Sequence, residues 1–128
     1  MPKRDSSVPW KQPGTARSMA IAACLATIFT FPLAALIALL YRFPLPFVGY
    51  ESGVDAVVPA LYAVYFYGVW LGGFVIVGVL GAAAGFTVYL RNNADSAVYW
   101  KGMFWLSACT AGVPLLVLST LDYLIGPW

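Results

Sequence analysis

The residue type best suited to chemistry in this chain is cysteine, of which the sequence holds two, Cys24 and Cys109, with no histidine. Both cysteines lie in long apolar stretches, where a thiol is a poor nucleophile. Two thiols without histidine also make a poor set of metal ligands, because zinc and most related metals take three or four protein groups. We therefore expect both cysteines to be buried structural residues, and we expect no metal or other cofactor.

The three long apolar stretches of the sequence, 18–41, 59–90 and 102–121, contain no Asp, Glu, Lys, Arg or His. They therefore offer no side chain of these types for acid–base catalysis. Ionisable groups inside a membrane usually mark proton relays, ion pathways and catalytic sites. Neither connecting loop offers a catalytic pair. The sequence therefore predicts a protein that is not an enzyme.

Glycine forms the most distinctive spacing in the chain, with one GxxxG pair in 68–72 and another in 81–85. Small residues let the backbones of membrane helices approach closely. With 100° per residue, five small residues fall within an arc of about 140°. They are Gly68, Gly72, Gly78, Ala82 and Gly85. We predict that this face is a helix-packing interface, either with other helices of the same chain or with a second copy or partner subunit.

The composition places the chain in a membrane. Its 128 residues are 62% hydrophobic and 9% charged, with a mean hydropathy of +0.83. That leaves too little polar surface for a water-soluble globule, and the length supports one small domain. The expected partners are the lipid bilayer and either other membrane protein subunits or further copies of this chain, with no nucleic acid.

Three apolar stretches are long enough to cross a bilayer, which takes about 20 residues. They predict an all-α integral membrane protein with three transmembrane helices over 18–41, 59–90 and 102–121. The first stretch is too long for a secretion signal and is not followed by a small-residue cleavage site. The second and third should form an antiparallel hairpin, since the link between them is too short to cross a bilayer. Pro32 and Pro114 should kink the first and third helices.

The second stretch is longer than a membrane requires. At about 1.5 Å per residue it would extend about 48 Å, against a hydrocarbon core of about 30 Å. Tyr62, Tyr65, Tyr67 and Trp70 crowd its beginning, and aromatic residues prefer the membrane interface. The embedded part should therefore begin near Gly68.

The remaining segments flank these helices. Residues 1–17 form a basic, proline-containing tail that we expect to be disordered and cytoplasmic, either freely solvated or touching anionic lipids. Residues 18–128 should form one transmembrane domain. The first loop, 43–56, is unusually apolar, which favours a position along the headgroups or against a partner.

Basic residues predict the orientation. Six of them (Lys3, Arg4, Lys11, Arg17, Arg91 and Lys101) fall on one side of the predicted helices, against Arg42 alone on the other. The positive-inside rule then places the N-terminus in the cytoplasm and the C-terminus outside, in a cell or inner membrane. Arg42 and Asp122 would reach the same outer interface, either as an ion pair or as two independently solvated groups.

No motif in the sequence identifies a family. The leucine spacing of 32–41 recurs in 114–123, which indicates either an internal repeat or a chance similarity of leucine-rich helices. The leading functional hypothesis is a non-enzymatic accessory or scaffolding subunit of a larger membrane complex. The alternative is a small oligomeric transporter or channel.

Overall fold

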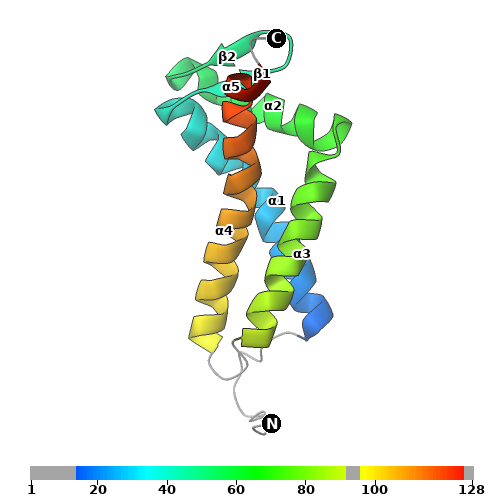
Figure 1. Ribbon diagram of the computed structural model, residues 1–128. Helices are drawn as coiled ribbons and strands as arrows, with labels where there is room; N and C mark the ends of the chain where they lie inside the picture. Colours follow the sequence, from blue (N-terminus) through cyan, green and yellow to red (C-terminus); the bar gives the residue numbers. More distant parts are fainter. Residues whose placement is uncertain (1–13, 92–95, 126–128) are drawn as a thin grey trace, which may run out of the picture.

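The computed structural model describes residues 14–91 and 96–125, apart from the side chains of 122 and 123. Helices dominate these residues, together with one short hairpin (Figure 1). In chain order the elements are α1 Thr15–Leu40, β1 Phe43–Leu45, β2 Gly49–Glu51, the 3-10 helix η1 Val54–Ala56, α2 Val57–Trp70, α3 Gly73–Arg91, α4 Ser96–Thr120 and α5 Asp122–Ile125. Three of them, α1, α3 and α4, are long and apolar enough to cross a membrane. The prediction of three such helices is confirmed.

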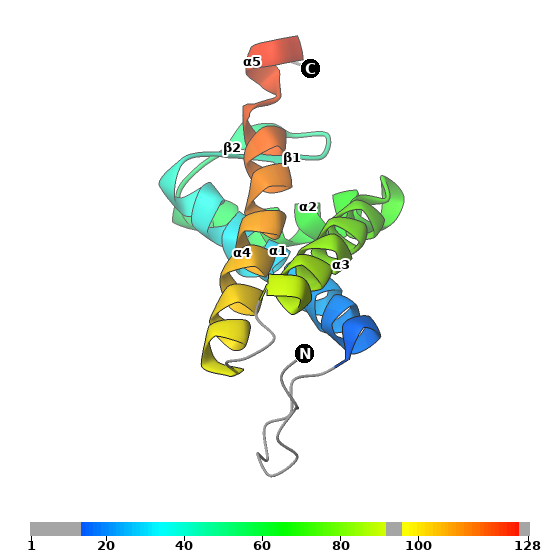
Figure 2. The ribbon, with the colours of Figure 1, turned by 60° about the horizontal axis from the view of Figure 1, so that its bottom comes forward.

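Helix α1 lies at the centre of the bundle and runs obliquely across α3 and α4 (Figures 1 and 2). Every fourth residue of α1 is buried, and all of these residues are small. They are Ser18, Ala22, Ala26, Thr30, Ala34 and Ala38. Because none has a long side chain, the neighbouring backbones can approach closely along most of the helix.

The predicted single helix over 59–90 is wrong, because two helices occupy this stretch. Helix α2 ends at Trp70 and α3 begins at Gly73. Gly72, between them, has a φ of +71°, a left-handed conformation that ends a helix and favours glycine. Helix α2 then runs across one end of the bundle, and α3 runs along it (Figure 1). The break explains how an apolar stretch longer than a bilayer is accommodated, because only α3 of the two helices is long enough to cross one.

The first loop contains a two-stranded β-sheet, so the purely helical fold class is wrong in this detail. Its strands β1 and β2 pair antiparallel, with Pro44 opposite Tyr50. Proline is tolerated because both strands of a two-stranded sheet are edge strands. The whole of β1 is buried, and the backbone N–H of Gly53 donates to the carbonyl oxygen of Ala38 at 2.9 Å. The hairpin is therefore fastened to α1.

Helix α1 buries only small side chains, and all three long helices expose large apolar ones. Exposed residues include Ile28 and Leu36 on α1, Val75 and Val79 on α3, and Phe104 on α4. A soluble protein of this kind would present an apolar surface far beyond the few hundred Å² usual for monomers. An apolar solvent removes that conflict, because lipid tails are as apolar as leucine.

Candidate functional site

The described residues carry little metal or thiol chemistry. Among them, no three His, Cys, Asp or Glu side chains gather as a metal site. Cys24 and Cys109 are free and exposed, so their predicted burial is wrong. Each follows a buried residue, Ala22 or Ser107, by two positions. Two positions correspond to about 200° around a helix, which turns both thiols away from the core.

The five residues of the predicted glycine face are divided by the helix break. Gly68 belongs to α2, Gly72 to the break, and Gly78, Ala82 and Gly85 to α3. The structure therefore does not bring them together on one helix face. A Cβ at Gly68 would collide with the ring of Phe74, whereas Gly78 has no atom within 4 Å of such a Cβ.

Close packing between α1 and α3 occurs at Gly81 and Gly85. A Cβ at Gly85 would lie 2.7 Å from the Cβ of Ala22, and one at Gly81 would lie 2.9 Å from the Cβ of Ala26. Real Cβ atoms do not approach this closely, so only glycine fits at these two positions. Gly81 lies outside the predicted arc, which was drawn for a single helix over 59–90.

Pro32, Pro114, Arg42 and Asp122 are the other residues that the sequence singled out. Pro32 and Pro114 lie inside α1 and α4, which continue through them. The guanidinium carbon of Arg42 lies 4.9 Å from the ring centroid of Tyr50 and 5.4 Å from that of Tyr41, so the cation is placed over aromatic rings. The side chain of Asp122 lies outside the described part of the chain, and the ion pair stays a prediction.

One end of the molecule carries a layer that we call the hairpin platform, formed by β1, β2 and α2. Its inner side contributes to the main hydrophobic core through Phe43, Leu45, Ala60, Ala63 and Val64. Its other side exposes large apolar and aromatic residues. They include Phe47, Val48, Val58, Tyr62, Tyr65 and Trp70. The platform is therefore held firmly from beneath and is apolar on its outer side.

Phe47, at the tip of the hairpin, stands out on the platform. Its φ of +69° lies in the left-handed region, which costs a residue with a Cβ roughly 1–2 kcal/mol. The side chain is 98% exposed, and its ring lies 5.9 Å from that of Phe66. Folding alone gains little from a phenylalanine here, so the residue is a candidate for an external contact.

Two apolar grooves flank the hairpin where it meets α2. The first, which we call the tyrosine groove, has a volume of about 500 Å³ and lies between the hairpin turn and the end of α2. Its walls include Val48 and Tyr50 on one side and Phe66, Tyr67 and Leu71 on the other. The second groove, about 540 Å³, runs along the exposed side of α2 past Val58, Tyr62 and Trp70. No charged residue lines either groove.

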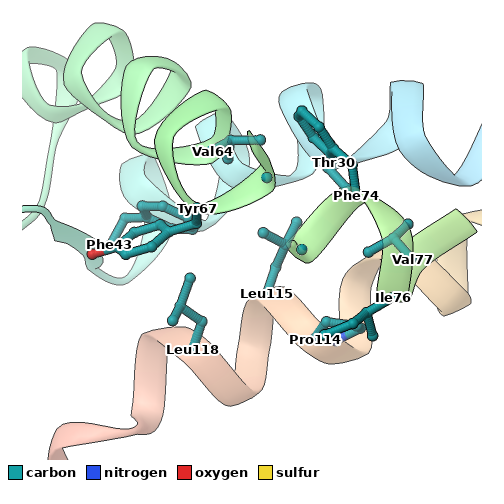
Figure 3. Close-up of a pocket in the computed structure, with 12 residues that line it drawn as sticks. Thr30, Phe43, Val64, Tyr67, Phe74, Ile76, Val77, Pro114, Leu115 and Leu118 are labelled. Carbon is teal, nitrogen blue, oxygen red and sulfur yellow. The ribbon is translucent and has the colours of Figure 1, made fainter. Parts of the chain in front are cut away.

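A smaller apolar cavity of about 110 Å³ lies beneath the platform, at the level of the helix break. Side chains from all four main helices converge on it, among them Thr30, Tyr67, Phe74 and Leu115 (Figure 3). The Thr30 hydroxyl donates to the carbonyl oxygen of Thr27 at 2.6 Å and is thereby satisfied within its own helix. The cavity therefore offers apolar contact and no reactive group.

Searches against protein-family models, curated proteins and solved structures find no match to this chain. The arrangement itself must therefore indicate the function. Sequence reasoning anticipated that the first loop is apolar but did not identify Phe47 or the grooves. The aromatic residues at the start of the second stretch were the signal for the platform, because a membrane core does not favour them.

Proposed function

We propose that the protein is a multi-pass membrane protein in which α1, α3 and α4 cross the bilayer, with the N-terminus cytoplasmic and the C-terminus outside. Arg17, Arg91 and Lys101 support this orientation, because all three lie at or near the helix ends opposite the platform (Figure 1). On this reading α3 and α4 form a transmembrane hairpin, and the platform lies at the outer interface.

Within this topology, the best-supported role is that of a non-enzymatic accessory or scaffolding subunit of a larger membrane complex. The observation that carries the proposal is the outer side of the hairpin platform, where Phe47, Tyr62 and Trp70 are exposed above a fixed core. Aromatic residues are enriched at protein interfaces because they bury a large area with few rotatable bonds. A rigid platform of this kind suits a subunit that positions a partner.

The alternative role, a small oligomeric transporter or channel, has less support. Among the described residues the cavity between the long helices is apolar and measures about 110 Å³. A conduction pathway would therefore have to form between several copies. The small residues in the closest contacts, the buried stripe of α1 with Gly81 and Gly85 of α3, already face other helices of the same chain.

The orientation is tested with reporter fusions. An alkaline phosphatase fused after residue 128 should be active outside the cytoplasm, and one inserted in the loop 92–95 should be inactive. The reverse pattern would overturn the orientation.

The accessory role is tested by photo-crosslinking in native membranes. A photoreactive phenylalanine analogue at Phe47 or Tyr62 should form a discrete adduct with another protein. The same analogue at Val75, exposed on the side of α3, is the matched control and should label lipid only. Adducts with lipid alone at all three positions would reject the accessory role. Adducts only between copies of this chain would favour the oligomeric alternative.

A further inference from the structure

We infer that the tyrosine groove binds one hydrocarbon chain of a membrane lipid, with the Tyr67 hydroxyl donating a hydrogen bond to the ester group at the head of that chain. This inference depends on the membrane location of the protein and is independent of the accessory role.

The size and lining of the groove fit a single apolar ligand. Its volume of about 500 Å³ falls within the roughly 300–1,000 Å³ typical of small-molecule sites. Most of its lining is proline, valine, leucine and phenylalanine, and no charged side chain takes part. A charged headgroup would lose its hydration inside such a groove without compensation, whereas a hydrocarbon chain would lose nothing.

The position of the groove gives lipid direct access. Leu71 lines the groove and lies at the break between α2 and α3. Val75 and Ile76, in the first turn of α3 after the break, are also apolar and exposed. In the proposed topology these residues of α3 face the hydrocarbon of the outer leaflet. A lipid chain can therefore reach the groove past Leu71 from the apolar side of α3.

The two tyrosines provide the polar end of the site. The Tyr50 hydroxyl donates to the carbonyl oxygen of Leu118 at 3.4 Å, and the Arg42 guanidinium lies over the Tyr50 ring. Among the described residues, no group accepts a hydrogen bond from the half-buried Tyr67 hydroxyl. Burial and the neighbouring Tyr50 raise the pKa of Tyr67 above its ordinary value of 10.0, so its hydroxyl stays protonated and able to donate. An ester carbonyl at the head of the chain would satisfy this donor.

A segment of a partner protein fits the groove less well. Addition of a β-strand needs an edge of useful length, and β1 and β2 have three residues each. A helix with side chains is roughly 10 Å wide, so this volume would admit little more than one turn of it. A flexible chain without hydrogen-bonding backbone groups matches the space better.

The test uses the purified full-length chain, reconstituted in nanodiscs of palmitoyl-oleoyl phosphatidylcholine and then released into mild detergent for native mass spectrometry. We expect one retained lipid for each chain. Leu71→Trp and Val48→Trp fill the groove from opposite walls and should each reduce retention by about tenfold or more. Tyr67→Phe should reduce it by about threefold to tenfold, the loss expected for one hydrogen bond.

Val58→Trp is the matched control and should leave retention unchanged, because Val58 lines only the second groove. The three enlarged positions are 60–67% exposed, so helical content by circular dichroism should be unaltered in each variant. Absence of a retained lipid, or retention that neither Leu71→Trp nor Val48→Trp lowers, would overturn the inference. A photoreactive residue at position 71 that labels a protein in native membranes and no lipid would also overturn it. Failure here leaves the crosslinks at Phe47 and Tyr62 unaffected, so the two proposals can fail separately.

Discussion

The close contact of α1 and α3 predicts that the same substitution has opposite effects at two glycines of one helix. At Gly85 an alanine Cβ would overlap the Cβ of Ala22 and lie 2.9 Å from the carbonyl carbon of Ser18. The carbonyl belongs to the backbone of α1 and cannot rotate away, so the helices must separate. At Gly78 nothing lies within 4 Å of the new methyl group.

The expected magnitudes follow from two competing terms. Replacing glycine by alanine inside a helix gains roughly 0.5–1 kcal/mol. Overpacking a close contact costs roughly 1–3 kcal/mol. Gly78→Ala has only the first term and should stabilise the fold by about 0.5–1 kcal/mol. Gly85→Ala has both terms, and the second should prevail, for a net loss of about 1–2 kcal/mol.

The assay is reversible unfolding in mixed micelles with increasing sodium dodecyl sulfate, followed by circular dichroism and tryptophan fluorescence. Gly78→Ala serves as the control for helix propensity, because it lies on the same helix and carries the same chemical change. Stabilisation of similar size by Gly78→Ala and Gly85→Ala would refute the close approach of α1 and α3.

Two further substitutions test other contacts by the same assay. Phe47→Gly should be more stable than Phe47→Ala by about 0.5–1 kcal/mol, because both lose the ring and only glycine relieves the left-handed φ; equal stabilities would show that the turn is not strained. The buried hydrogen bond of 2.6 Å between the hydroxyls of Ser18 and Tyr99 should give a coupling energy of about 0.6–1.7 kcal/mol in a double-mutant cycle of Ser18→Ala and Tyr99→Phe. A coupling of zero would place the hydroxyls apart.

Length and hydrophobicity were sufficient to predict the three long helices, because a bilayer imposes both on any helix that crosses it. The first predicted helix, 18–41, differs from α1 only at its ends. The third, 102–121, begins six residues after the start of α4, because the predicted helix was bounded at Lys101. A charged side chain near a helix end can extend to the headgroups, so Lys101 does not end the helix.

The break at Gly72 was harder to predict, because no proline or charge interrupts 59–90. Two local signals were present. Adjacent glycines at 72 and 73 allow a left-handed turn, and five aromatic residues precede them in a segment that a membrane core would not favour. Phe47 gave no comparable signal, because left-handed turns usually use glycine or asparagine and the hairpin has a glycine two residues later.

The arrangement around α1 follows from the spacing of its small residues. The search for GxxxG pairs missed this stripe, because it is built from serine, alanine and threonine. A spacing of four residues advances about 400° on a helix with 100° per residue, so each step turns the stripe by about 40°. Five steps lead from Ser18 to Ala38 and turn it by about 200°. The stripe therefore cannot face one neighbour throughout. Near its start, Ala22 packs with Val88 of α3 and Met103 of α4.

Near its end, the same stripe faces the platform, where Ala34 and Ala38 pack with Ala60 of α2 and Phe43 of β1. Because α1 presents different sides at its two ends, α2 and α3 must meet it from different directions. A straight helix over 59–90 could not satisfy both contacts, whereas two helices joined at Gly72 can. The rotation of the stripe thus accounts for the break in α2–α3, and the break in turn places the tyrosine groove at the end of the bundle.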